Sequence, residues 1–274
     1  MERDWRFTKH RRSLIPSAPR QHHLQIDEGR MKKIFFTLLL ASLLLSCAKK
    51  DEKTGAEISY LKAYKFLKDK NYSQAADEFE KIDEDFPFSK WSQKAQTMAV
   101  YARFKDEDYQ KLNATVEDFL RLNPNSEYVP YMIYMKGLSH YNIIPNIERA
   151  QDDTQQASYT FRELIARFPG SEYAADASEK LDFIDEHLAG AKMSVGRYEM
   201  RHNNFLGALE YFSEVNSRYR QTKQIPEALF RLSEIYYKIG IKDEAEKAVQ
   251  QLDQRFQGNY WTELAKKNQT RLKQ

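Results

Sequence analysis

The side chains that could carry out chemistry are few and scattered. Three of the six histidines fall within the first 30 residues, and the others, His140, His187 and His202, match no metal-ligand spacing such as HxxxH. The sequence contains neither a glycine-rich phosphate loop nor a GxSxG motif. Carboxylate runs such as residues 83–85 are typical of solvated helix ends. We therefore expect no enzymatic activity, no metal site and no bound cofactor.

The single cysteine, Cys47, stands directly after an apolar run. Lys32 and Lys33 come first, and the run from Ile34 to Leu45 follows with only two polar members. A basic start, a short apolar run and a small residue are typical of a bacterial secretory signal peptide, which we predict over residues 31–46. Twelve residues rise only about 18 Å as a helix, too little to cross a hydrocarbon core of about 30 Å.

The four residues from Leu44 to Cys47 resemble a lipobox, the site at which a bacterial lipoprotein is cleaved and acylated on its cysteine. We expect a covalent lipid on Cys47, with residues 47–57 as the tether to the folded part. The alternative is an ordinary signal peptide with an incidental thiol. Several acyl chains would hold the protein firmly on a membrane. Ala48, in place of an aspartate, resembles lipoproteins that are sent on to the outer membrane.

The basic charge of the chain comes from its N-terminal part. The formal net charge is +3, but residues 1–46 hold nine of the basic and four of the acidic residues, which leaves the remaining 228 residues at −2. A nucleic-acid partner is therefore not expected, because phosphate binding requires a basic face. Residues 1–30 show no apolar periodicity, and we expect them to be a mis-called or disordered extension, with translation starting at Met31.

The segment from Asn71 to Pro87 returns four more times along the chain. Each copy has a small or apolar residue, a large apolar residue four positions later and another three positions after that. The three columns are Ala75, Leu112, Ala157, Ala208 and Ala245; Phe79, Val116, Phe161, Phe212 and Val249; and Ile82, Phe119, Leu164, Val215 and Leu252. This spacing is one stripe of an amphipathic helix. The copies start 37, 45, 51 and 37 residues apart, near the 34-residue tetratricopeptide period.

We therefore predict an all-α fold, a tetratricopeptide-like superhelical array of about five helix-turn-helix repeats. Residues 58–187 would hold repeats 1 to 3, and residues 188–274 repeats 4 and 5 with a closing helix. In the third repeat, Ile143 to Thr154 is expected as an insertion. Separate helices are expected from Ala174 to Leu188 and from Leu188 to Arg201. Polar residues that can cap the next helix stand between repeats, at Ser89, Ser126, Ser171 and Asn259.

The first helix of each tetratricopeptide unit lines the inner groove of the array, which predicts two kinds of surface. In the N-terminal half most of the groove positions are aromatic: Tyr60, Tyr64, Tyr101, Phe104, Tyr131, Tyr134 and Tyr141, together with Leu67, Thr97 and Leu138. In the C-terminal half they are mixed and charged, and we predict partner docking there by Arg197, Arg201, Glu234, Tyr237 and Lys238. An aromatic groove suits an extended peptide, and a charged and aromatic surface suits a folded partner. The alternative for any one tyrosine is packing between helices, with its hydroxyl in water.

The chain resembles the BamD (ComL) family of lipoproteins in three runs that follow the lipobox: Tyr134 to Leu138, Phe168 to Ala177 and Met193 to Tyr198. The resemblance implies a scaffold of the β-barrel assembly machinery, anchored in the outer membrane and facing the periplasm. It implies binding of the C-terminal strands of unfolded barrel precursors, docking on a BamA-like subunit and contact with other assembly lipoproteins. The alternative is another lipid-anchored tetratricopeptide adaptor, such as a pilot protein for secretin or pilus assembly.

Overall fold

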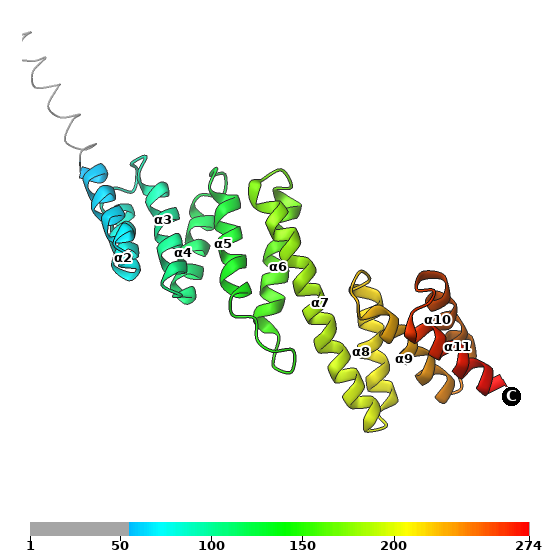
Figure 1. Ribbon diagram of the computed structural model, residues 1–274. Helices are drawn as coiled ribbons and strands as arrows, with labels where there is room; N and C mark the ends of the chain where they lie inside the picture. The colour runs from blue at the N-terminus through cyan, green and yellow to red at the C-terminus, as the bar shows by residue number, and fades with distance from the viewer. Residues whose placement is uncertain (1–54, 274) are drawn as a thin grey trace, which may run out of the picture. The chain divides into compact units, whose positions relative to one another are not determined.

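The computed structural model describes residues 55–273, so the predicted signal peptide, Cys47 and most of the tether lie outside the described residues. Within that range all regular elements are helices (Figure 1). A helix over residues 55–68 comes first. It is followed by α2 (Tyr72–Asp85), α3 (Ser92–Lys105), α4 (Tyr109–Leu122), α5 (Val129–Tyr141), α6 (Asp152–Arg167), α7 (Glu172–Arg201), α8 (Phe205–Arg218), α9 (Ile225–Lys238), α10 (Lys242–Arg255) and α11 (Tyr260–Lys273).

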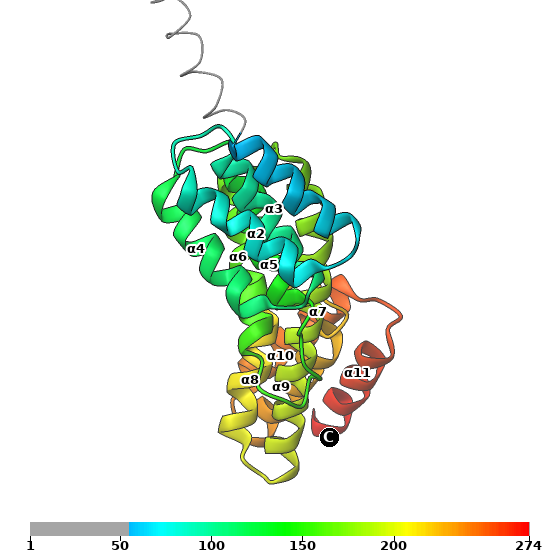
Figure 2. The same ribbon diagram turned by 90° about the vertical axis from the view of Figure 1, so that its left-hand side faces the viewer.

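Each helix packs mainly against the next one in the sequence, as Figures 1 and 2 show. Contacts that skip one helix join α3 to α5, α5 to α7 and α9 to α11. The first helix of one repeat therefore lies against the first helix of the next, which is the arrangement of stacked helix-turn-helix units. The predicted all-α fold of tetratricopeptide-like repeats is confirmed.

The three apolar columns of the repeat form the core. Every member is buried, from Ala75, Phe79 and Ile82 in the first repeat to Leu252 in the last. Where a column residue on the second helix of a repeat is large, the first helix of that repeat carries a small residue opposite it, as Gly137 does opposite Phe161 and Gly196 does opposite Phe212. A Cβ added to Gly137 would lie 2.4 Å from the Phe161 ring. Phe161 and its neighbours thus occupy the space that a side chain on the first helix would need.

Polar side chains in three of the turns between repeats accept hydrogen bonds from nearby backbone N–H groups. The backbone N–H of Trp91 donates to Ser89 Oγ at 3.3 Å, and that of Tyr128 donates to Ser126 Oγ at 3.3 Å. In the last turn the N–H of Trp261 donates to Asn259 Oδ1 at 2.9 Å. The capping role is confirmed at Asn259, which directly precedes α11. Ser89 and Ser126 instead stabilise the turn before the helix, because α3 and α5 are directly preceded by Trp91 and Tyr128. Ser171 Oγ is buried and has no hydrogen-bond partner among the described residues.

The prediction of two separate helices before and after Leu188 was wrong. Residues Glu172–Arg201 form one continuous helix of 30 residues, and the predicted boundary at residues 187 and 188 falls inside it. The helix continues because Leu188, Ala189 and Ala191 are all buried against neighbouring elements. As a result α7 packs on α5 and α6 and also pairs with α8. The predicted insertion in the third repeat is shorter than expected, since α6 already begins at Asp152.

A buried guanidinium joins α3 to α2. Arg103 is only 2% exposed, and its Nη2 lies 2.5 Å from Asp77 Oδ1 and 2.8 Å from Glu80 Oε2. Its Nη1 lies 3.7 Å from Asp108 Oδ2, just before α4. The three carboxylates retain contact with water, so the cation is buried while its partners are partly hydrated.

Candidate peptide-binding groove and docking surfaces

The predicted aromatic groove corresponds to a hollow between α3 and the starts of α5 and α7. Its volume is about 670 Å³. Four tyrosines contribute to its wall together with polar and small residues, and the full lining is Thr97, Met98, Tyr101, Glu127, Tyr128, Pro130, Tyr131, Ser171, Glu172 and Tyr173. Tyr101 is 36% exposed, so its ring is available to a ligand. The hollow provides an aromatic surface built from three successive repeats.

The aromatic surface continues between α5 and α7. Tyr173 is the central ring, with its centroid 5.7 Å from that of Tyr131 and 5.1 Å from that of Tyr134. Further along, the centroids of Tyr141 and Phe183 are 5.7 Å apart, and the Phe183 side chain is 50% exposed. We call this set the aromatic run; its members are Tyr101, Tyr131, Tyr173, Tyr134, Tyr141 and Phe183. Such rings offer large apolar contact area at low cost in side-chain entropy.

A polar contact fixes the middle of the aromatic run. The Tyr134 hydroxyl donates to Asp176 Oδ2 at 2.6 Å, and Lys180 Nζ donates to Asp176 Oδ1 at 2.9 Å. Burial raises the pKa of Tyr134, and the hydrogen bond to Asp176 raises it further. Burial alone would raise the pKa of Asp176, but the hydrogen bonds from Tyr134 and Lys180 hold it below its ordinary value. The carboxylate therefore stays ionised and orients the Tyr134 ring.

The first repeat contributes less surface than its sequence suggests. Tyr60 is only 7% exposed, because its ring packs against Phe79 at 5.2 Å and Trp91 at 4.8 Å between centroids. Tyr64 is more exposed and stacks on Tyr60. Phe104 is half-buried against Tyr109. Of the seven aromatic residues expected in the groove, four belong to the aromatic run: Tyr101, Tyr131, Tyr134 and Tyr141.

Tyr173 and Phe183 were not among the groove residues expected from the sequence. Both lie on the N-terminal part of α7. Phe183 falls within the extra helix expected from Ala174 to Leu188, and Tyr173 directly precedes that range. Because α7 is continuous, its N-terminal part serves as the first helix of the fourth repeat and packs against α5, the first helix of the third repeat. The period of 51 residues before the fourth copy was the signal that a long helix had been inserted.

The charged side chains of the C-terminal half form a ladder between α7 and α9. Arg197 Nη1 lies 3.2 Å from Glu227 Oε2, and Arg231 Nε lies 3.4 Å from Glu227 Oε1. Arg231 Nη1 in turn lies 2.9 Å from Glu234 Oε2. We call these four residues the charged ladder. All four are partly exposed, so water and salt screen their attraction.

Three of the predicted docking residues meet in one hollow of about 490 Å³ beside α9 and α11. Glu234, Tyr237 and Lys238 line it together with Phe205 and Arg271. The Lys238 ammonium lies 4.2 Å from the centre of the Phe205 ring. The Tyr237 hydroxyl is buried and has no hydrogen-bond partner within residues 55–273, so a polar group that enters the hollow could accept or donate a hydrogen bond there.

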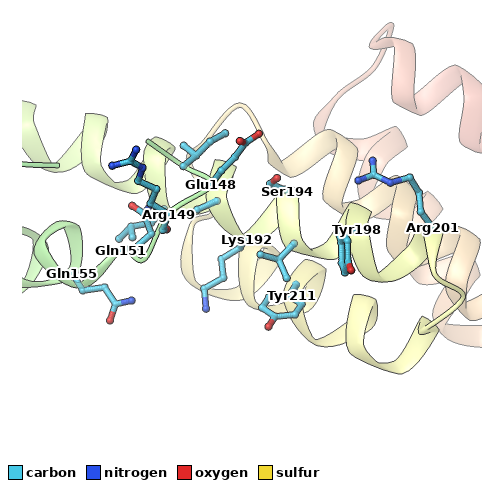
Figure 3. Close-up of a pocket in the computed structure, with 13 residues that line it drawn as sticks. Glu148, Arg149, Gln151, Gln155, Lys192, Ser194, Tyr198, Arg201 and Tyr211 are labelled. Atoms are coloured by element: carbon cyan, nitrogen blue, oxygen red, sulfur yellow. Dashed lines mark hydrogen bonds between the residues drawn. The ribbon is translucent and has the colours of Figure 1, made fainter. Parts of the chain in front are cut away.

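Arg201 lies in a different hollow, of about 520 Å³, between the loop before α6 and the helices α7 and α8. Figure 3 shows Arg149 and Arg201 toward opposite ends of this hollow, with Lys192 and Tyr198 between them. Lys192 Nζ is paired with Glu214 Oε2 at 2.8 Å. The structure thus divides the five predicted docking residues among the ladder and two separate hollows.

Residues 55–273 contain no group of three or more histidine, cysteine or acidic side chains placed to hold a metal ion. Over the same residues, no helix combines the length and apolar character needed to cross a membrane.

A stack of helical repeats with aromatic and charged surfaces defines a helical-repeat binding scaffold. A family model described as YfiO, an outer membrane lipoprotein, matches residues 52–252, and the chain therefore belongs to this family. The resemblance to the BamD family that the sequence indicated is confirmed.

Two relatives illustrate the relationship, and both are outer membrane protein assembly factors called BamD. The protein of Caulobacter vibrioides is 31% identical over 245 residues, which cover 87% of this chain and 80% of the relative. The protein of Rickettsia prowazekii is 30% identical over 241 residues, which cover 86% of this chain and 96% of the relative.

Among solved structures, the TPR2AB domain of yeast Sti1 in its complex with pHSP90 matches with a TM-score of 0.41 at 11% identity, over 78% of this chain and 82% of that one. A tetratricopeptide repeat protein from Parabacteroides merdae matches with a TM-score of 0.36 at 10% identity, over 77% of this chain and 84% of that one.

Proposed function

We propose that this protein is a non-enzymatic lipoprotein scaffold of the outer-membrane β-barrel assembly machinery. Membership of an outer membrane lipoprotein family and relatives that are assembly factors support this role. The lipid on Cys47 anchors the chain to the outer membrane, with the repeats in the periplasm and in contact with other assembly lipoproteins. No cofactor is required, because precursor folding into the membrane supplies the driving force.

The N-terminal half receives the C-terminal strand of an unfolded barrel precursor. The observation that carries this assignment is the aromatic run, in which three pairs of rings have centroids 5.1 to 5.7 Å apart. An extended strand presents side chains on one face about every 6.6 Å, a comparable spacing. Apolar and aromatic side chains of the strand can therefore contact successive rings, while the hollow beside Tyr101 accommodates a large terminal side chain.

The C-terminal half docks on the BamA-like barrel subunit. The charged ladder and the hollow lined by Glu234, Tyr237 and Lys238 offer paired charges beside an aromatic ring. Surfaces of this kind favour folded partners and set their orientation through electrostatic complementarity. The two halves thus hold two partners at the same time, which is what a scaffold needs in order to pass a substrate on.

Peptide binding tests the assignment of the N-terminal half. The double variant Tyr101→Ala with Phe183→Ala removes exposed rings from opposite ends of the aromatic run. Fluorescence anisotropy with a labelled precursor peptide should show affinity lowered about tenfold or more, since truncation of an aromatic hot-spot residue costs about 2 kcal/mol or more. The matched control is Tyr159→Ala, which removes a more exposed ring on α6 outside the run. Equal affinity of the double variant and the control would contradict the assignment.

Capture from solubilised envelopes tests the choice of assembly machinery. The intact chain should recover a BamA-like barrel protein, and Lys238→Glu should weaken that recovery while leaving peptide affinity unchanged. Recovery of a secretin or of pilus proteins without such a barrel protein would favour the alternative adaptor function instead.

A further inference from the structure

The turn between α2 and α3 presents an unusual side chain. Phe88 is 101% exposed, so its ring packs against nothing within the described part of the chain. The turn itself is well organised, with the Ser89 N–H donating to the Phe86 carbonyl oxygen at 3.0 Å and the Ser92 N–H donating to the Ser89 carbonyl oxygen at 3.2 Å. Phe88 is therefore held outward by an ordered backbone and contributes nothing to the core.

The other copies of the same turn show that no phenylalanine is needed for its geometry. The four residues at the equivalent position are polar or glycine: Asn125, Gly170, Gln221 and Gly258. Only the first turn combines a phenylalanine with a lysine two residues later, at Lys90. The Lys90 and Lys94 ammonium groups lie 5.4 and 5.3 Å from the centre of the Trp91 ring. Aromatic rings combined with lysines are typical of side chains at a membrane–water interface.

The turn between α2 and α3 lies close in space to Gly55, the first residue that the structure describes. A Cβ added to Gly55 would lie 3.1 Å from Cζ of Phe86, so the start of the first helix touches the turn. Gly55 is only eight positions after Cys47 along the chain. A chain of that length reaches at most about 28 Å when fully extended. A lipid on Cys47 would therefore keep this turn close to the membrane surface.

We propose that the turn is a second membrane contact, in which the Phe88 ring enters the interfacial region of the lipid layer that holds the anchor. This inference rests on the lipid attachment included in the proposed function. Glu84 and Asp85 lie exposed just before the turn and offset the attraction of Lys90 and Lys94 to anionic headgroups. The contact therefore depends on burial of the apolar ring and serves to orient the repeats relative to the membrane.

A fluorescent probe placed in the turn tests this contact in the full lipidated chain. Cys47 is the only natural cysteine and is blocked by its lipid, so Phe88→Cys provides a unique thiol for an environment-sensitive dye. The matched control is Asn125→Cys, at the same position in the next copy of the turn. In phospholipid vesicles with a spin label at the headgroup, the dye at position 88 should shift its emission to the blue and be quenched. The dye at position 125 should show neither effect.

The possible results separate the contact from the anchor. An acylated, vesicle-bound chain whose dye at position 88 behaves like the one at position 125 overturns the second contact alone. Protection of position 88 that appears only after assembly proteins are added also overturns it, since the occupant is then a protein. A chain whose mass shows no acyl groups overturns the anchor, and the second contact with it.

Discussion

The two halves of the repeat array place their charges in opposite ways. In the N-terminal half one cation, Arg103, is buried inside the fold at 2% exposure beside three carboxylates, while the surface between α3, α5 and α7 is aromatic. In the C-terminal half the charged ladder of Arg197, Glu227, Arg231 and Glu234 is partly exposed between α7 and α9. The same kinds of side chain therefore stabilise the fold in one half and are available to a partner in the other.

The largest difference between the halves should appear when the buried cation loses its partners. The double variant Asp77→Asn with Glu80→Gln leaves Arg103 buried with Asp108 as its remaining carboxylate. We expect the free energy of unfolding to fall by about 3 kcal/mol, because an uncompensated buried charge is costly. Urea unfolding followed by circular dichroism measures the change. Asp253→Asn is the control, since it removes a more exposed pair with Lys266; an equal loss in both variants would contradict the comparison.

Core packing should respond alike in both halves. A Cβ at Gly137 would lie 2.4 Å from Phe161, and one at Gly196 would lie 2.6 Å from Phe212. Each glycine-to-alanine change should destabilise the fold by about 1 kcal/mol net, since overpacking outweighs the gain in helix propensity.

Gly190→Ala is the matched helical control for these two variants. Its nearest neighbour would be Ile147 Cγ2 at 3.9 Å, so it should stabilise the helix by about 0.5 to 1 kcal/mol. Thermal unfolding of the three variants tests this order. A stabilising Gly137→Ala would show that Phe161 can move aside.

Breaking the charged ladder should have a smaller effect on stability. Glu227→Gln removes the carboxylate that bridges Arg197 and Arg231. Because these groups are partly hydrated, we expect a loss below about 1 kcal/mol, which becomes smaller still at high salt. If the proposed docking by the C-terminal half is correct, the same variant should also weaken capture of a BamA-like subunit. A stability loss as large as that of the Arg103 variant would erase the distinction between the halves.

The smallest effect concerns pH. The pKa of Asp176 is lowered in the folded state, so its contribution to stability is fully present above its ordinary value of 3.8 and is lost as the pH falls through the lower folded value. Tyr134→Phe removes one of the hydrogen bonds that lower this pKa. The acid side of the curve of melting temperature against pH should therefore become less steep in the variant. An unchanged curve would show that Lys180 alone accounts for the shift.

The sequence predicted the repeats and the core well because both depend on local spacing. Ala75, Phe79 and Ile82 lie on one helical stripe, and the same stripe returns in every copy. Predictions of the site were less complete. Tyr60 was expected in the groove, yet Phe79 and Trp91 enclose its ring. Tyr173 was not expected there, because the predicted helix began only at Ala174, whereas α7 begins at Glu172 and packs on α5.

What the sequence by itself determined is the succession of amphipathic helices, their small and large core residues and the family to which they belong. These properties follow from the 3.6-residue period of a helix, which any local segment displays. Only the tertiary structure decided which tyrosines remain accessible, that Arg103 is enclosed, and that Glu234, Tyr237 and Lys238 share one hollow. Exposure and charge pairing depend on side chains that distant segments bring together, and a local pattern does not contain that information.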